Sequence, residues 1–287
     1  MIGRWAALGR ELRRPLAFLG ALGERFSRHR MPGLAAGLAF YFLLAFFPFI
    51  LFLVAVVTLV PGVEGLTDWL LKSAADYVPQ EAFKMVEGII RGVLSTRRSG
   101  LVSIGVVLAL WSSSSGFSSV MDCLNVAYGV TTRRAWWKAR LEALWLTIAL
   151  SFFMVLAFVL TLFAGPLATL VGSYLGPAGG VATIAFNWVI SLALVTLVTA
   201  TIYYVCPDVE EQPWQWLSPG VVVFTVGFGV ASAGFSVWVA RFGSYDKTYG
   251  SLGAPIILLF WLYLLATFLL LGGELNAYLD ERRADQR

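Results

Sequence analysis

The chain has few of the residues on which most enzyme and metal sites depend. Its 287 residues include one histidine, two cysteines and four lysines. Hydrolases and transferases need several convergent titratable groups, and zinc sites need clustered histidines and cysteines. None of the four lysines follows a glycine, so the chain has no Walker A motif for ATP. We therefore expect no metal ion, no other cofactor and no enzymatic activity.

Charge is also scarce. Only 13% of the residues are charged, against roughly 25% in an ordinary soluble domain. Hydrophobic residues make up 59%, and the mean hydropathy is +0.78. A globular core cannot hide this much apolar surface from water, so the chain needs a bilayer as its second solvent. The composition excludes a soluble enzyme and predicts an all-α, polytopic membrane helix bundle.

Long uncharged runs predict the membrane spans. An Asp, Lys or Arg in the middle of a span costs about 2.5 to 3.5 kcal/mol, so spans avoid these residues. The run 143–207 has no charge and is long enough to turn once, which we place at Gly165, Pro166 and the glycines of 176–180. Six spans are expected, near 34–60, 101–121, 143–164, 181–205, 218–240 and 252–278.

Basic residues predict the orientation. The N-terminal arm, the 122–140 loop and the C-terminus hold 14 of the 21 basic residues. Because Lys and Arg near spans tend to stay inside the cell, both termini should be cytoplasmic. The expected organisation is a cytoplasmic basic arm over 1–32, a six-span domain over 33–279 with an outer amphipathic loop at 61–100, and a cytoplasmic tail over 280–287.

The arm combines arginines with apolar residues at helical spacing: Trp5, Leu8, Leu12, Leu16, Leu19 and Phe26. This pattern is typical of an amphipathic helix that lies on the anionic inner leaflet, so membrane lipids are the expected partners. The neighbouring spans explain the basic residues as topology signals, and no nucleic-acid partner is expected. Small residues such as Gly227, Ala231 and Gly234 indicate close helix packing and leave a homo-oligomer open.

Two predicted spans carry polar faces. In the second span, one half of the helical wheel contains Trp111, Ser112, Ser115, Ser118, Ser119, Asp122 and Asn125. In the last span, Tyr263, Thr267, Glu274 and Tyr278 lie within about 60° of each other. The fourth span adds Asn187. Polar groups inside a bilayer face the interior of the bundle or a wet cavity.

Glu274 has two interpretations of equal weight. An intramembrane carboxylate is a candidate functional group, for example one linked to proton movement. Alternatively, Glu274 lies near the cytoplasmic interface, where it caps a helix or pairs with an arginine such as Arg133 or Arg134. The single histidine, His29, lies in the arm and has no obvious partner in the sequence.

Three sequence runs carry a family resemblance: LAFYFLLAFFPFIL at 38–51, LWSSSSGFSSVMDCLNVAYGV at 110–130 and YGSLGAPIILLFWLYLLATFLLLGGELNAYL at 249–279. With Pro207, Trp214 and the pair Pro219 and Gly220 in order between them, the chain resembles the YihY/virulence factor BrkB family from about residue 30 to 280. The positions that match its motifs include Tyr41, Pro48, Trp111, Asn125, Tyr128, Tyr249, Gly250, Gly253, Trp261, Glu274, Leu275 and Asn276.

The resemblance implies a bacterial inner-membrane protein of about six spans, with proposed roles in envelope integrity, serum resistance or lipid export. The family was once labelled ribonuclease BN. A zinc-type nuclease needs clustered histidines, and the single histidine of this chain argues against that activity. The loop 206–217 is acidic here, whereas relatives often have a basic one, so its contacts are open.

The leading hypothesis is a transporter-like protein that binds or moves an amphiphile, such as an envelope lipid, through a groove between the second, fourth and sixth spans. The competing hypothesis is a scaffold, in which hydrogen bonds between helices occupy the polar faces. The candidate residues along the path are Trp111, Ser112, Ser115, Ser119, Asp122, Asn125, Asn187, Tyr263, Thr267, Glu274 and Tyr278.

Overall fold

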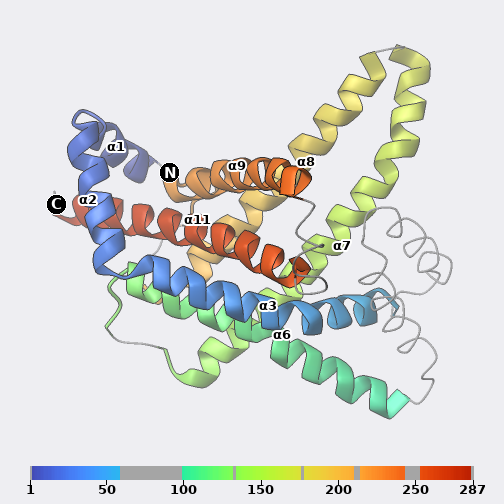
Figure 1. The fold of residues 1–287 in the computed structure, drawn as a ribbon, viewed down its shortest axis with the longest axis horizontal. Coiled ribbons are helices and arrows are strands. Elements are labelled where there is room, and N and C mark those ends of the chain that lie inside the picture. The colour runs from blue at the N-terminus through green and yellow to red at the C-terminus, as the bar shows by residue number, and fades with distance from the viewer. Residues whose placement is uncertain are drawn as a thin grey trace.

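The computed structural model describes residues 2–58, 99–131, 134–175, 178–209, 214–242 and 253–285, and every regular element in these ranges is an α-helix (Figure 1). The helices are α1 (Ile2–Glu11), α2 (Pro15–Arg28), α3 (Met31–Thr58), α6 (Ser99–Ala127), α7 (Trp136–Leu175), α8 (Ala178–Val205), α9 (Pro219–Phe242) and α11 (Gly253–Ala284). The last six cover the six ranges that the uncharged runs predict.

The helices have the apolar length that a bilayer requires. Trp136–Leu156 and Pro255–Ala284 are each long and apolar enough to cross a membrane. Shorter apolar helical segments lie at Met31–Phe46, Val189–Val205 and Pro219–Phe235 among the residues described. The fold is therefore an all-α helix bundle of the membrane type, as the composition predicts.

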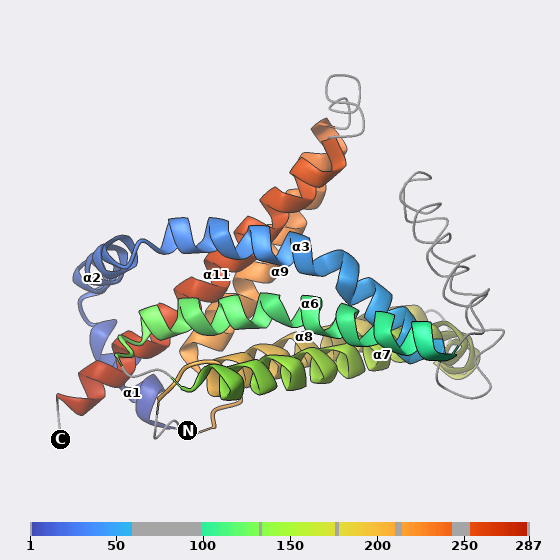
Figure 2. The same ribbon diagram turned by 90° about the horizontal axis from the view of Figure 1, so that it is seen from below.

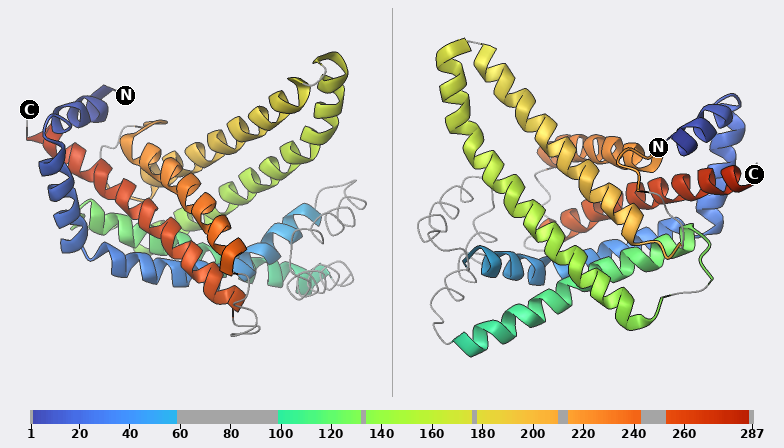
Figure 3. Two further views of the ribbon diagram at one scale, coloured as in Figure 1. Left: turned by 45° about the horizontal axis from the view of Figure 1, so that its top comes forward. Right: turned by 180° about the vertical axis from the view of Figure 1, so that it is seen from behind.

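The turn predicted within 143–207 is right at the glycines of 176–180 and wrong at Gly165 and Pro166. Helix α7 continues through Gly165 and Pro166 to Leu175, and α8 begins at Ala178. A proline is tolerated in a membrane helix because neighbouring groups can satisfy the backbone that it disrupts. Helices α7 and α8 form a hairpin that extends away from the other helices (Figure 3). The outer amphipathic loop predicted at 61–100 falls almost entirely outside the described residues.

The N-terminal arm forms two helices where the sequence predicts one. Pro15 occupies the first turn of α2, where its missing N–H costs nothing, and the chain bends between α1 and α2. Helix α2 runs across the ends of α3 and α11 (Figures 1 and 2). Phe18 and Leu22 of α2 pack against Leu275, Tyr278 and Leu279 of α11. The arm is therefore docked on the last helix.

Side-chain contacts hold the loops and termini at one end of the bundle. Arg4 of α1 forms a two-pronged pair with Asp280, at 2.8 Å from Nε and 2.5 Å from Nη2. Trp5 Nε1 donates to the Leu217 carbonyl at 2.7 Å. Arg134, which follows α6, donates to the Pro207 carbonyl at 2.9 Å. The basic segments that the sequence assigns to one side of the membrane thus meet at one end.

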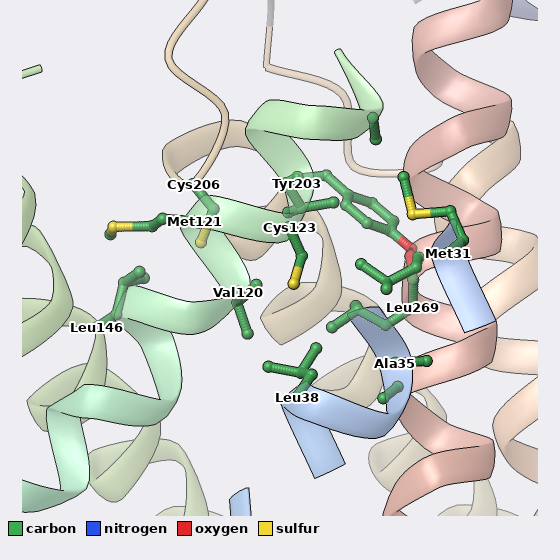
Figure 4. Close-up of a cluster of buried hydrophobic side chains, with 14 of the residues drawn as sticks. Met31, Ala35, Leu38, Val120, Met121, Cys123, Leu146, Tyr203, Cys206 and Leu269 are labelled. Atoms are coloured by element: carbon green, nitrogen blue, oxygen red, sulfur yellow. Dashed lines mark hydrogen bonds between the residues drawn. The ribbon is translucent and has the colours of Figure 1, made fainter. Parts of the chain in front are cut away.

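A central core joins the six long helices (Figure 4). Its buried side chains come from α3, α6, α7, the end of α8, α9 and α11, and include Met31, Ala35, Leu38, Val120, Met121, Cys123, Leu146, Tyr203, Cys206, Val221 and Leu269. The Tyr203 hydroxyl donates to the Leu269 carbonyl at 2.6 Å, so its burial leaves no unpaired donor. Burial raises the pKa of the Cys206 thiol, which therefore stays protonated and unreactive.

Helices α9 and α11 approach each other most closely at two glycines. A Cβ atom added to Gly220 would overlap the Gly272 carbonyl oxygen and would lie 2.5 Å from Asn276 Nδ2. Asn276 Oδ1 accepts a hydrogen bond from the Gly220 N–H at 2.9 Å, and its Nδ2 donates to Ser218 Oγ at 3.0 Å. Asn276 of α11 thereby caps the start of α9. The two helices cross so closely here that only glycine fits at position 220.

Candidate functional site

The polar stripe of α6 is only partly covered by other helices. Trp111 is 46% exposed, Ser112 and Asp122 are exposed, and Ser115 and Ser119 are half-buried. Ser115 Oγ donates to the Ser112 carbonyl at 2.5 Å, within the same helix. Such hydroxyls satisfy their donors locally and keep oxygen lone pairs free to accept further hydrogen bonds. This stripe is therefore a polar surface that still offers acceptors.

Arg140, at the start of α7, reaches across to this stripe. Its guanidinium lies 4.1 Å from the centre of the Trp111 ring, which is a cation–π arrangement. Its Nη2 donates to the Trp111 carbonyl at 2.5 Å, and its Nη1 donates to Ser118 Oγ at 3.3 Å. Its Nε is buried and has no hydrogen-bond partner. Arg140 therefore brings a positive charge to the polar stripe.

Exposed tryptophans surround this charge. The Trp136 ring lies 6.5 Å from the Trp111 ring, and Trp136 is 73% exposed. Trp137 and Trp145 of α7 are also exposed, and Lys138 Nζ lies 5.4 Å from the Trp137 ring. Tryptophans gather where a protein meets the headgroup level of a bilayer, because the ring is apolar and the indole N–H is polar. This corner of α6 and α7 has the composition of a membrane interface.

Glu274 lies elsewhere, fully buried within an ion cluster between the arm and α11. Its Oε2 accepts from Arg25 Nε at 2.7 Å, and its Oε1 lies 2.5 Å from His29 Nδ1. Arg25 also donates to Glu281 Oε1 at 2.8 Å and to the Ala127 carbonyl at 2.9 Å. Burial lowers the pKa of Arg25, but its bonds to Glu281 and Glu274 outweigh this and raise it overall. The cluster ties α2, α6 and α11 together.

This geometry corresponds to the structural interpretation of Glu274, with a different partner from the arginines named in the sequence. Arg134 instead pairs with Asp208 at 2.9 Å and with Glu142. His29, which has no obvious partner in the sequence, contacts Glu274. Neither partner of Glu274 is predictable from spacing, because both lie more than 240 residues away in the chain. The one feature that could have indicated this pairing is that all three residues are predicted at the same end of the bundle.

The remaining candidates take structural roles or lie apart. Asn125 Oδ1 accepts from the Asp208 N–H at 2.8 Å, so the acidic loop packs against the end of α6. Thr267 Oγ1 donates to the Tyr263 carbonyl at 2.8 Å within α11, and Tyr263 packs against the central core. The Tyr278 hydroxyl lies 3.1 Å from Glu11 Oε2. The Asn187 side chain is outside the described residues.

The structure therefore separates the predicted path into two places. The first is the α6 stripe with Trp111, Ser112, Ser115, Ser119 and Asp122, to which it adds Arg140. The second is the buried end of α11, where Glu274 and Tyr278 hold the arm. In the sequence, Arg140 follows Trp136 and Trp137 closely. The sequence alone indicates only that it contributes to the orientation of the protein in the membrane.

These features define a class of protein: a polytopic membrane helix bundle with a docked amphipathic arm and a partly exposed polar face. The virulence factor BrkB family model matches residues 22–287. The chain belongs to the virulence factor BrkB family. No solved structure matches the fold.

Curated relatives are also described mostly as membrane proteins. The chain is 33% identical over 270 residues to the ribonuclease-like protein YfkH of Bacillus subtilis, covering 93% of this chain and 97% of that protein. It is 27% identical to a UPF0761 membrane protein of Tolumonas auensis, covering 97% of this chain and 90% of the relative. It is 28% identical to the UPF0761 membrane protein azo3165 of Azoarcus, but spans only 65% of that longer protein.

The family assignment settles the broad class. BrkB and UPF0761 proteins form a membrane protein family and not a known enzyme family. The word ribonuclease belongs to the name of YfkH, and a zinc nuclease would need several clustered ligands. Among the searched residues of this chain, no group of three or more His, Cys, Asp or Glu side chains could hold a metal ion.

Proposed function

We propose that this protein binds or moves an amphiphile, such as an envelope lipid, along the polar stripe of α6. The observation that carries the proposal is the exposure of Trp111 and Ser112 on a helix of a membrane bundle. A polar surface that meets lipid costs free energy unless it has a polar partner. A lipid head group supplies that partner while its acyl chains remain in the bilayer.

The scaffold hypothesis predicts that bonds between helices occupy the polar faces. In α11 this holds, since Glu274 and Asn276 are fully buried and bonded to other elements. In α6 the pattern differs, because Ser115 of the stripe donates to a carbonyl of its own helix, and the one bond that Arg140 of α7 makes to a serine of the stripe, Ser118, is long at 3.3 Å. We therefore assign the head-group role to α6 and a structural role to the buried end of α11.

The mechanism follows from what α6 offers. Ser112 and Ser115 accept hydrogen bonds from hydroxyl or amine groups of a head group, and Arg140 attracts its negative charge. Trp111 and Trp136 pack against the glycerol region and the upper acyl chains, as indoles do at an interface. No step of this mechanism requires covalent chemistry.

The test is lipid movement between leaflets of proteoliposomes, measured with a fluorescent phospholipid and an aqueous quencher. The variant Ser112→Leu removes an exposed acceptor and covers the stripe. It is expected to slow movement about tenfold, as loss of roughly 1.4 kcal/mol of head-group binding would. The control is Ser191→Leu, an exposed serine of α8 outside the stripe. Movement no faster than in protein-free vesicles, or an unaffected Ser112→Leu variant, would contradict the proposal.

We place the protein in the bacterial inner membrane with both termini in the cytoplasm. Support comes from the basic arm, the α6–α7 connection and the C-terminal segment, which meet at one end of the bundle. At the elbow of the arm, Leu12, Leu16 and Leu19 are exposed among Arg13 and Arg14, a surface suited to the anionic inner leaflet.

Reporter fusions test this orientation. A C-terminal fluorescent protein that folds only in the cytoplasm should be bright, and a C-terminal phosphatase that is active only outside should be inactive. The same pair fused after residue 175, at the tip of the α7–α8 hairpin, should give the opposite signals. An active phosphatase at the C-terminus would reverse the assigned orientation.

A further inference from the structure

Arg140 is a cation whose protein contacts are all neutral. Its acceptors are the Trp111 carbonyl and the Ser118 hydroxyl, and the latter bond is long at 3.3 Å. Within the described ranges, every ion pair of the structure involves other cations: Arg4, Arg25, His29, Arg134 and Arg282. Among the residues that the structure describes, no carboxylate pairs with Arg140.

This imbalance is energetically unfavourable. Partial burial takes the guanidinium away from water, which disfavours its charge. An arginine nevertheless stays protonated in proteins, so the charge persists. An anion that reached the guanidinium would regain the lost solvation through charge-assisted hydrogen bonds, which are about twice as strong as neutral ones.

The side chains around Arg140 favour some anions over others. Trp136 is 73% exposed and Trp137 is also exposed, and both lie three or four residues before Arg140 on the same face of α7. An aromatic surface therefore borders the charge. A free phosphate gains nothing from such a surface. An anionic phospholipid uses both parts, since its phosphate pairs with the guanidinium and its chains lie along α6 and α7.

We propose that Arg140, framed by Trp111 and Trp136, binds the phosphate of an anionic phospholipid where α6 meets α7. The inference rests on the proposed function and deepens it, because it names the charge of the amphiphile and the residue that first contacts it. The phosphate oxygens accept hydrogen bonds from N–H groups at the edge of the guanidinium and replace the long bond to Ser118. The Trp111 ring keeps the guanidinium plane in place from the other side.

Native mass spectrometry of the purified full chain provides the test. The probes are dioleoyl phosphatidylglycerol, the zwitterionic dioleoyl phosphatidylcholine with the same chains, and inorganic phosphate. The wild type is expected to retain phosphatidylglycerol over phosphatidylcholine. The variant Arg140→Met keeps an unbranched side chain like the aliphatic part of arginine and loses its charge, and its affinity for phosphatidylglycerol should fall about tenfold. Inorganic phosphate should not compete.

Three further variants sharpen the result. Arg283→Gln, in the last turn of α11, removes one charge in a different helix and should leave binding unchanged. Trp136→Ala should weaken binding without unfolding the protein, because Trp136 is largely exposed. Arg140→Lys keeps the charge but loses the planar fork, so binding should be intermediate. Equal retention of both lipids, unchanged binding in Arg140→Met, or competition by inorganic phosphate would overturn the site.

The two assays distinguish a failure of the lipid-binding site from a failure of the proposed lipid movement. If the wild type binds phosphatidylglycerol through Arg140 but moves no lipid in proteoliposomes, the proposed function falls and the binding site stands. If the wild type moves lipid while Arg140→Met binds and moves it normally, the function stands and this site falls.

Discussion

Replacing Glu274 with leucine is expected to lower the free energy of unfolding by about 3 to 5 kcal/mol, because the variant leaves a buried charge without its partner. Arg25 loses its bond at 2.7 Å, and His29 loses its contact at 2.5 Å. Glu281, whose side chain is largely exposed, remains as a weaker partner for Arg25. Thermal unfolding in detergent should show a clear fall in Tm, with earlier proteolysis of the arm.

The paired variant separates charge from packing. Removing both partners, as in Arg25→Leu with Glu274→Leu, leaves no buried guanidinium and should recover part of the lost stability. Glu281→Gln is the matched control, since it alters the same cluster at its exposed edge and should cost at most about 1 kcal/mol. A double variant that is less stable than the sum of its single variants would contradict this account.

Glu274→Gln distinguishes the two interpretations of this residue. The amide keeps the shape and one acceptor but cannot balance Arg25, so a structural role predicts lower stability. A proton-linked role predicts normal folding with abolished lipid movement. A stable, folded Glu274→Gln protein that moves no lipid would return Glu274 to the transport path.

The fold was largely predictable from the sequence because one physical rule governs it. Charges are costly in a bilayer, so uncharged runs had to coincide with α3, α6, α7, α8, α9 and α11. The error at Gly165 and Pro166 arose because these residues end helices in water, whereas α7 continues through them. The arm was predicted as one amphipathic helix, and Pro15 instead begins a second helix after the bend.

The site was predictable only in part. Helical periodicity gave the α6 stripe, since residues three and four apart share a face within one helix. The partners of Glu274 and the position of Arg140 depend on how distant helices dock, and one sequence contains no record of that docking. The pairing of Asn276 with Gly220 was hidden for the same reason, although both belong to motifs of the family.

The second large effect is expected from Gly220→Ala, at the crossing of α9 and α11. The added Cβ would overlap the Gly272 carbonyl oxygen, and it would lie 2.5 Å from Asn276 Nδ2. Overpacked side chains usually cost about 1 to 3 kcal/mol, and much of that is relieved by rotamer changes. A backbone carbonyl cannot rotate away, so α9 must move and the Gly220 N–H loses its bond to Asn276. We expect a loss of about 3 kcal/mol or more.

Gly229→Ala in the same helix is the matched control for this prediction. Nothing lies within 4 Å of a Cβ added at Gly229, and alanine favours the helix over glycine, so the variant should be as stable as the wild type or slightly more stable. Both variants replace a glycine of α9 with alanine. The difference between their Tm values in one detergent therefore cancels the contribution of intrinsic helix propensity. If the two alanines behaved alike, α9 and α11 would not be in contact at Gly220, and Asn276 would have no role in capping α9. A loss of stability in Gly220→Ala alone would instead show that the family motif around Asn276 holds α9 and α11 together. This structural role of the motif is consistent with head-group binding at α6.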